Sequence, residues 1–116
     1  MSSECLFCRI VAGEVPSTVV YETESAVAFR DLHPQARTHV LIVPRAHYTD
    51  AVDLAGKQPE LLGELTLAAG AVAEQEGLAE AGYRLVFNTG GHAGQTVFHV
   101  HLHLLGGEQL GLFGRA

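Results

Sequence analysis

The feature that most constrains the fold is a segment near the C-terminus in which histidines alternate with aliphatic residues. The segment reads His99-Val100-His101-Leu102-His103-Leu104-Leu105. Because successive side chains of a β-strand point to opposite faces of a sheet, this alternation predicts a strand, which we place over Val97 to Leu105. The three histidines should share one face, about 6–7 Å apart along the strand, and the aliphatic side chains should enter the core.

Three imidazoles on one otherwise apolar strand indicate chemistry rather than packing. Alternate histidines can converge on one zinc ion, which would activate a bound water. Alternatively, an imidazole can attack a phosphorus centre or exchange a proton at neutral pH, because its ordinary pKa is about 6.5. The strand by itself leaves both chemistries open.

A glycine-rich loop, Asn88 to Gly94, leads into this strand. Loops of this kind can turn several backbone N–H groups toward an anion. Gln95 and Thr96 follow directly and add an amide and a hydroxyl donor. The position of this loop next to the histidines favours attack at a phosphorus centre.

Several other segments have the patterns of regular elements. They are a short helix within Cys5 to Val15, a main helix over Pro59 to Gly77, and strands over Val19 to Tyr21, Ala26 to Phe29, Thr38 to Val43 and Tyr83 to Phe87. The main helix carries its leucine and alanine side chains at steps of three and four, which gives it one apolar face. The order of elements predicts an α+β fold in which helices cover one face of an antiparallel five-stranded sheet.

Length and composition narrow the class of protein. A chain of 116 residues is expected to form one domain, 1–116. Its net charge of −6 argues against a nucleic-acid polymer as ligand, because such ligands require a basic face. No apolar run approaches the roughly 18 residues of a membrane span, and the first residues lack the basic region of a signal peptide. We therefore expect a cytoplasmic protein without a membrane partner.

The motifs together resemble the histidine triad (HIT) superfamily, and within it the Hint-like branch of zinc-binding bacterial type. The alternating histidines match the superfamily motif, and the Gly94-Gln95-Thr96-Val97-Phe98 run precedes them as in the Hint branch. The resemblance extends to Cys5–Ser17 and Asp31–His47, and it covers about Cys5 to Gly107. It implies a HIT-like fold with a main helix and a short N-terminal helix, whose five-stranded sheet extends across a homodimer.

The same resemblance implies a nucleotide-binding hydrolase that acts at the α-phosphate of purine nucleotides, with nucleoside phosphoramidates as substrates. His101 would be the nucleophile that forms a covalent nucleotidyl-histidine, which water then cleaves. A carbonyl of a neighbouring strand is expected to hold its Nδ1 proton and leave Nε2 free. His103, with the donors of Gln95 and Thr96, would stabilise the phosphoryl charge, and His39 would relay a proton.

The resemblance also assigns residues to the nucleotide. Asp31 would hold the ribose hydroxyls, and Leu32 would line the base pocket. Asn88 would lie beside the phosphate, and Gly94 belongs to the anion-binding loop. His33 is expected to be a loop residue, and His92, which departs from the usual family pattern, is expected to be an exposed loop histidine.

A metal site is the second expectation. Cys5 and Cys8 offer two thiolates, and a tetrahedral zinc needs two more ligands. By resemblance to zinc-binding bacterial Hint-like proteins, His47 and His99 would complete the site, and His99 would then be structural rather than catalytic. The residues alone leave a pair of core thiols or a redox pair open as alternatives.

Other functions remain open at this point. A dinucleoside polyphosphate hydrolase would have to hold a second anionic group, for which Arg37 and Arg45 are the nearest cations in sequence. A regulatory or adaptor module that only binds nucleotides is another class. A zinc hydrolase built on the three strand histidines is the third, and chelation should abolish activity in that case alone.

Overall fold

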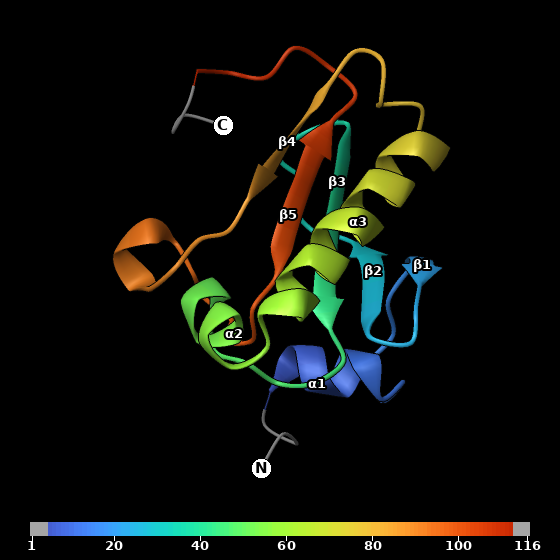
Figure 1. The fold of residues 1–116 in the computed structure, drawn as a ribbon. Coiled ribbons are helices and arrows are strands. Elements are labelled where there is room, and N and C mark those ends of the chain that lie inside the picture. The colour runs from blue at the N-terminus through green and yellow to red at the C-terminus, as the bar shows by residue number, and fades with distance from the viewer. Residues whose placement is uncertain (1–4, 113–116) are drawn as a thin grey trace.

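The structure is a computed structural model that describes residues 5–112, so both ends of the expected domain 1–116 lie outside the described residues. The strands are Val19–Glu22 (β1), Ala26–Arg30 (β2), Thr38–Pro44 (β3), Tyr83–Val86 (β4) and Leu102–Gly106 (β5). The helices are Leu6–Val11 (α1), Ala51–Lys57 (α2) and Pro59–Gln75 (α3), and Gly91–Ala93 forms a 3-10 turn. The five strands make one antiparallel sheet in the order β1-β2-β3-β5-β4 (Figure 1), which confirms the expected α+β class.

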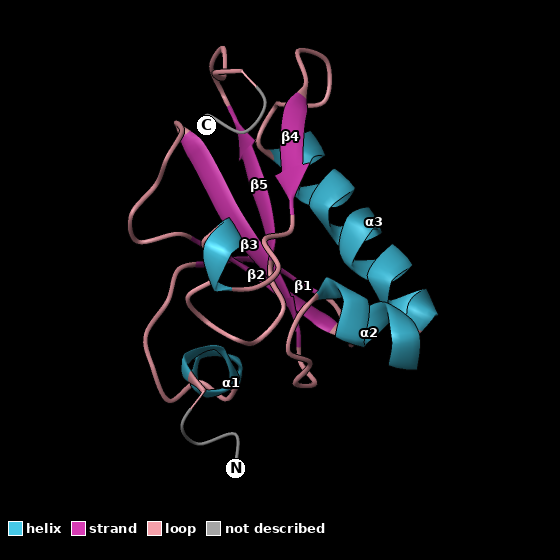
Figure 2. Cartoon of the chain, turned by 90° about the vertical axis from the view of Figure 1, so that its left-hand side faces the viewer, coloured by secondary structure: helices cyan, strands magenta, loops and turns pink. Residues whose placement is uncertain are grey.

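The main core lies between α3 and one face of the sheet (Figure 2). The apolar face of α3 packs on the aliphatic side chains of β3 and β5, and the buried residues include Leu65, Ala68, Ala69, Val72, Val40, Ile42, Leu102 and Leu104. The helix begins at Pro59 as expected, and Gly77, with φ at +76°, follows its end. Within the part of the chain that the structure describes, no helix has the length and hydropathy needed to cross a membrane.

The expectation that helices cover only one face of the sheet is wrong. The short helix α1 packs on the opposite face, where its buried Phe7 contacts a second cluster formed by Val27, Phe29, Leu41 and Val43. These strand residues alternate with the residues of the main core, so β2 and β3 are buried on both faces. A strand buried on both faces is apolar throughout, and its sequence gives no sign of which helix covers which face.

The histidine strand begins later than expected, at Leu102 instead of Val97. Its pairing with β3 runs only as far as Ile42 opposite Leu102. The partner strand ends at Pro44, which has no backbone N–H to donate to the ladder. Upstream of this point the chain pairs elsewhere, and the N–H of Val100 donates to the carbonyl of Tyr48 over 2.7 Å. The alternation of faces nevertheless continues, because Val100 is buried in the main core together with Leu102 and Leu104.

Candidate active site and metal centre

His101 lies just before β5, on the face of the sheet that carries α1. Its Nδ1 is 2.9 Å from the carbonyl oxygen of His99. Because a carbonyl only accepts, Nδ1 must carry the proton and Nε2 keeps the lone pair. We expected a carbonyl of a neighbouring strand in this role, but the carbonyl belongs to the segment that carries His101 itself. Burial lowers the pKa of His101, while the hydrogen bond to His99 and the charge of Asp31 oppose this change.

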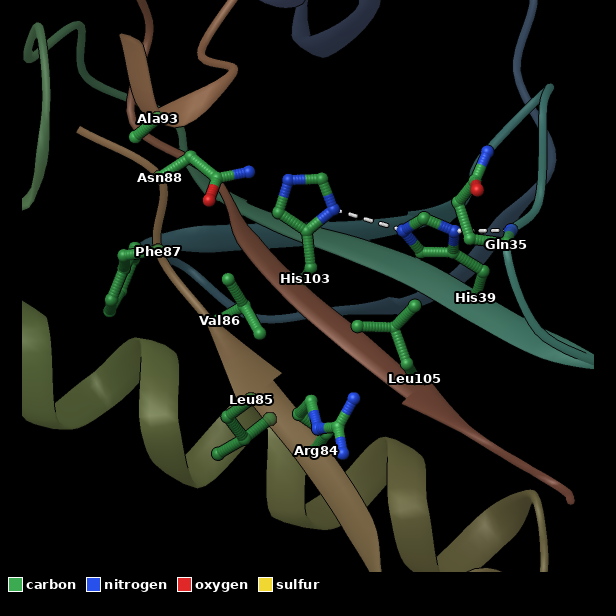
Figure 3. A pocket seen from close by; sticks show the side chains of 10 residues that line it. All are labelled: Gln35, His39, Arg84, Leu85, Val86, Phe87, Asn88, Ala93, His103 and Leu105. Carbon is green, nitrogen blue, oxygen red and sulfur yellow. Dashed lines mark hydrogen bonds between the residues drawn. The ribbon is translucent and has the colours of Figure 1, made fainter. Parts of the chain in front are cut away.

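His103 is joined to His39 by a hydrogen bond between two imidazoles (Figure 3). The backbone N–H of Gln35 donates to His39 Nδ1 over 3.0 Å, so the proton of the neutral His39 ring must be on Nε2. Nε2 then donates to His103 Nδ1 over 2.9 Å, which leaves the proton of His103 on its own Nε2. The backbone therefore fixes the tautomers of both rings and makes His103 Nε2 a donor.

The Asp31 carboxylate lies beside the His39 imidazole. One of its carboxylate oxygens accepts from the N–H of His33 over 2.8 Å, and the other is 3.4 Å from His39 Nε2. Asp31, His39 and His103 are close enough together to be considered as metal ligands. The hydrogen bond from the Gln35 N–H to His39 Nδ1 argues against a metal site. A metal on His39 Nε2 would place the ring proton on Nδ1, where it would face the Gln35 N–H. We interpret the group as two hydrogen-bonded imidazoles beside a carboxylate.

A cavity of about 320 Å³ lies beside these histidines, which is at the small end of ligand-binding sites. Its polar lining consists of Ser17, Arg30, Asp31, His33, Gly94, Thr96, His101 and His103. Its apolar lining includes Leu6, Phe7, Ile10, Leu32 and Leu41. The structure thus brings together most of the residues assigned to nucleotide binding. Leu32 is 84% exposed, so it stands at the rim of the cavity.

Asn88 lies on the other side of His103, in a second cavity of about 640 Å³ over β3, β5 and β4 (Figure 3). This cavity is also lined by Arg84, which the sequence analysis missed. Arg84 Nη2 donates to the carbonyl of Gly111 over 2.7 Å, and among the described residues its buried Nη1 has no hydrogen-bond partner. The alternation along β4 could have indicated this position. Arg84 lies two residues before Val86, the partner of His103, so the side chains of Arg84 and Val86 share one face of the strand.

Gln95 does not present its amide to the cavity. The side chain is buried, and its oxygen accepts from the N–H of Gly90 over 2.8 Å. Its amide nitrogen donates to the carbonyl of Thr49 over 2.7 Å and to that of Val97 over 3.2 Å. The expected role of Gln95 as a phosphate donor is therefore replaced by a structural one, since the side chain holds the glycine-rich loop in place.

Cys5, Cys8, His47 and His99 converge at the start of α1. Each sulfur lies 3.4 Å from His99 Nδ1, and Cys8 Sγ is 3.3 Å from His47 Nδ1. A tetrahedral zinc, with Zn–S near 2.3 Å and Zn–N near 2.0–2.1 Å, requires S···N separations of roughly 3.5 Å. The four donors are therefore spaced for such an ion, and the donor set is one that zinc prefers.

The surroundings of His99 support the same interpretation. Its Nε2 lies 2.9 Å from the carbonyl of Pro44, so Nε2 carries the proton and Nδ1 keeps its lone pair toward the cysteines. Burial lowers the pKa of His99 to about 4, which keeps the ring neutral. A neutral ring, held from behind by a carbonyl, is the usual form of a metal-binding histidine.

The three alternating histidines, His99, His101 and His103, are thus divided between two sites. His99 turns Nδ1 to the cysteines, whereas His103 turns Nδ1 to His39. This geometry contradicts the hypothesis that one zinc ion is held by all three. His33 and His92 are exposed in loops, as expected. Arg45 forms an ion pair with Glu22 and lines neither cavity.

Comparison with known proteins gives consistent matches. The family described as HIT domain matches residues 12–110. The chain is 46% identical over 111 residues to a purine nucleoside phosphoramidase of Escherichia coli (strain K12), covering 96% of this chain and 93% of that protein. It is 48% identical over 110 residues to a 14 kDa zinc-binding protein of Zea mays, covering 93% and 85% of the two. A solved structure of a HIT family hydrolase from Legionella pneumophila Philadelphia 1 superposes with a TM-score of 0.91 at 49% identity, covering 96% of this chain and 99% of that one.

Proposed function

Because the chain belongs to the HIT domain family and is a nucleotide hydrolase of that family, we propose that it hydrolyses purine nucleoside phosphoramidates at the α-phosphate. The observation that carries this proposal is the tautomer of His101. Its Nδ1 proton is held by the His99 carbonyl, so the Nε2 lone pair is available in the cavity that Asp31 and Thr96 line. The similarity to a purine nucleoside phosphoramidase supports the class of substrate.

The reaction proceeds in two displacements. In the first, His101 Nε2 attacks the α-phosphorus, the P–N bond breaks, and the nitrogen takes a proton from solvent and departs as a neutral amine. In the second, water attacks the phosphorus, and His101 leaves as neutral imidazole while the water proton returns to solvent. The products are the amine and the nucleoside monophosphate, so atoms and charge balance over the two steps.

His103 and the glycine-rich loop stabilise the charge that develops on the phosphoryl oxygens. His103 Nε2–H donates to one oxygen, and the Thr96 hydroxyl provides a further donor. Gly94 lines the cavity but supplies no donor, because its N–H already donates to the carbonyl of Gly91 over 3.0 Å. His39 keeps His103 in this donor tautomer and is therefore a positioning residue. For His39 to take up a proton from His103, the hydrogen bond from the Gln35 N–H would have to break.

The pH profile should reflect the buried histidines. Burial, with the neighbouring His101 and His39, lowers the pKa of His103 to about 4, and burial also lowers the pKa of His39. The His103 ring should stay neutral until the pH falls toward 4, and the His39 ring should stay neutral at the ordinary value of about 6.5. Because burial also lowers the pKa of the nucleophile His101, we expect kcat to keep more than half of its neutral-pH value at pH 6.5. A profile that loses half of its activity at pH 6.5 or above would contradict this assignment.

A kinetic panel tests the substrate class. Adenosine and guanosine phosphoramidates should be hydrolysed with kcat/KM at least ~100-fold higher than dinucleoside polyphosphates. One observation favours the alternative of a dinucleoside polyphosphate hydrolase, namely the Arg84 guanidinium in the cavity next to His103. A preference for dinucleoside polyphosphates would therefore move the assignment to this alternative.

We also propose that Cys5, Cys8, His47 and His99 hold one zinc ion. Four protein ligands leave no open position on the metal, so the ion supplies structure and not reaction chemistry. It would tie the start of α1 to the segments around Pro44 and His101. A site that needs two reduced thiols suits a reducing compartment, and we place the protein in the cytoplasm.

The protein should be a homodimer whose sheet continues across the subunit interface. The edge strand β4 is short, and its Tyr83 and Leu85 are 38% and 37% exposed. An open edge with exposed apolar side chains is costly unless another chain pairs with it. Light scattering at micromolar concentration should give twice the single-chain mass of 12.4 kDa. A mass equal to that of one chain would contradict this prediction.

A further inference from the structure

The helix α1 takes part in both sites. Cys5 is the residue at its N-terminal cap and Cys8 lies in its first turn, so α1 carries two of the four proposed zinc ligands. On another side, Leu6, Phe7 and Ile10 of the same helix line the cavity that we assign to the nucleotide. Any shift of α1 therefore changes the metal site and the cavity together.

Besides these two sites, α1 is held by the packing of Phe7, Ile10 and Val11 on the second apolar cluster. The helix has six residues, and Phe7 is its one buried residue. A helix of this length is not stable by its own backbone hydrogen bonds and depends on tertiary contacts. Its position should therefore respond to anything that binds on either side of it.

The proposed nucleophile His101 contacts both α1 and a residue of the metal site. The Phe7 ring meets the His101 ring edge to face, with centroids 4.9 Å apart and planes at 89°. Phe7 also contacts Phe29 at 5.5 Å and His99 at 6.1 Å. His101 Nδ1 donates to the backbone carbonyl of His99, whose own ring is a proposed zinc ligand. Two contacts thus orient His101. One comes from Phe7, which lies between the two cysteines in the sequence, and the other comes from the backbone of His99, a proposed zinc ligand.

We propose that zinc and the nucleotide bind cooperatively through α1, and that Phe7 is the positioning residue through which the metal site orients His101. The proposal rests on the proposed function, because it takes the cavity beside His101 as the nucleotide site. Coupling between two binding sites is reciprocal. If zinc raises the affinity for a nucleotide by some factor, the nucleotide must raise the affinity for zinc by the same factor.

Adenosine 5′-monophosphate, the product of the proposed reaction, is the probe. Its Kd should be measured by calorimetry on the zinc-loaded and the zinc-free protein. The Kd of zinc should be measured by competition with a chelator, with and without saturating nucleotide. We expect each ligand to tighten the other by the same factor, at least ~5-fold, within the range usual for coupled sites. The chelator measurement starts from the zinc-loaded protein, so it remains valid if the zinc-free protein is poorly folded.

Phe7→Leu tests the route of coupling, and Tyr21→Leu is the matched control, because Tyr21 is an aromatic residue that lines neither cavity. Phe7→Leu keeps the apolar character of the contact but removes the ring that meets His101. We expect it to retain one zinc per chain, to reduce the coupling factor toward one, and to lower kcat by roughly 10-fold. Tyr21 packs against the main core, and its replacement should leave the coupling factor unchanged.

The outcomes separate this proposal from the proposed function. If the nucleotide binds equally well with and without zinc, and zinc affinity does not respond to the nucleotide, the coupling is wrong while the function stands. Full coupling and full kcat in Phe7→Leu would show that Phe7 does not carry it. If the zinc-loaded protein does not bind adenosine 5′-monophosphate at all, the proposed function is contradicted, and the coupling with it.

Discussion

Replacing His101 with alanine should lower turnover by at least ~10³-fold while the protein stays folded and still binds nucleotide. The effect is large because one side chain acts twice in the proposed reaction, first as nucleophile and then as leaving group. Nucleotide binding should persist, since Asp31, Thr96 and the apolar lining of the cavity are unchanged. Initial rates with an adenosine phosphoramidate, together with the Kd of adenosine 5′-monophosphate, measure both parts of this prediction.

His92→Ala is the matched control. His92 is exposed in the 3-10 turn and lines neither cavity, so its removal should leave turnover close to that of the parent protein. His101→Gly opens space at the position of the missing ring, and added imidazole should restore part of the activity. Near-normal turnover in His101→Ala would show that the nucleophile lies elsewhere.

Loss of the metal should have the second largest effect, on stability. A ligand that binds only the folded state adds about 4 kcal/mol when present at ~1,000 times its Kd. For a domain of this size, each kcal/mol corresponds to roughly 4 °C in Tm. Cys5→Ser, which removes one of the four donors, should therefore lose its zinc and melt more than about 10 °C below the parent protein. Elemental analysis and a thermal melt measure the two consequences.

Chelation provides the control for this variant. Treating the parent protein with a chelator should lower its Tm to a similar extent, and added zinc should restore it. The same chelator should change Cys5→Ser little further, because its site is already weakened. A parent protein that contains no metal and melts at the same temperature as Cys5→Ser would contradict the zinc assignment.

The alternation of histidines and aliphatic residues was sufficient to predict that Val100, Leu102 and Leu104 enter the main core. It was not sufficient to predict where the strand begins. Alternation is a property of the segment itself, whereas a strand also needs a partner, and β3 ends at Pro44. The position of Gln95 next to the glycine-rich loop is visible in the sequence, but the three backbone groups that its side chain bonds are brought together only by the fold.

The contacts that build the sites join residues far apart in the chain, and spacing alone does not reveal them. Phe7 meets His101 because α1 folds back over the sheet, and Arg84 comes to line the second cavity through its place on β4. The grouping of His47 and His99 with the two cysteines was expected only from resemblance to a family. The fixed tautomers of His39 and His103 depend on the N–H of Gln35, which no sequence pattern indicates.

The central claim is that the nucleotide becomes covalently bound to His101 during the reaction. Hydrolysis of a phosphoramidate that carries a sulfur of known configuration at the α-phosphorus, in isotopically labelled water, tests this claim most directly. Each in-line displacement inverts the configuration at phosphorus, so two displacements restore it. The account predicts net retention in the nucleoside phosphorothioate product. Net inversion would mean that water attacks the phosphorus directly, and it would contradict the covalent role of His101.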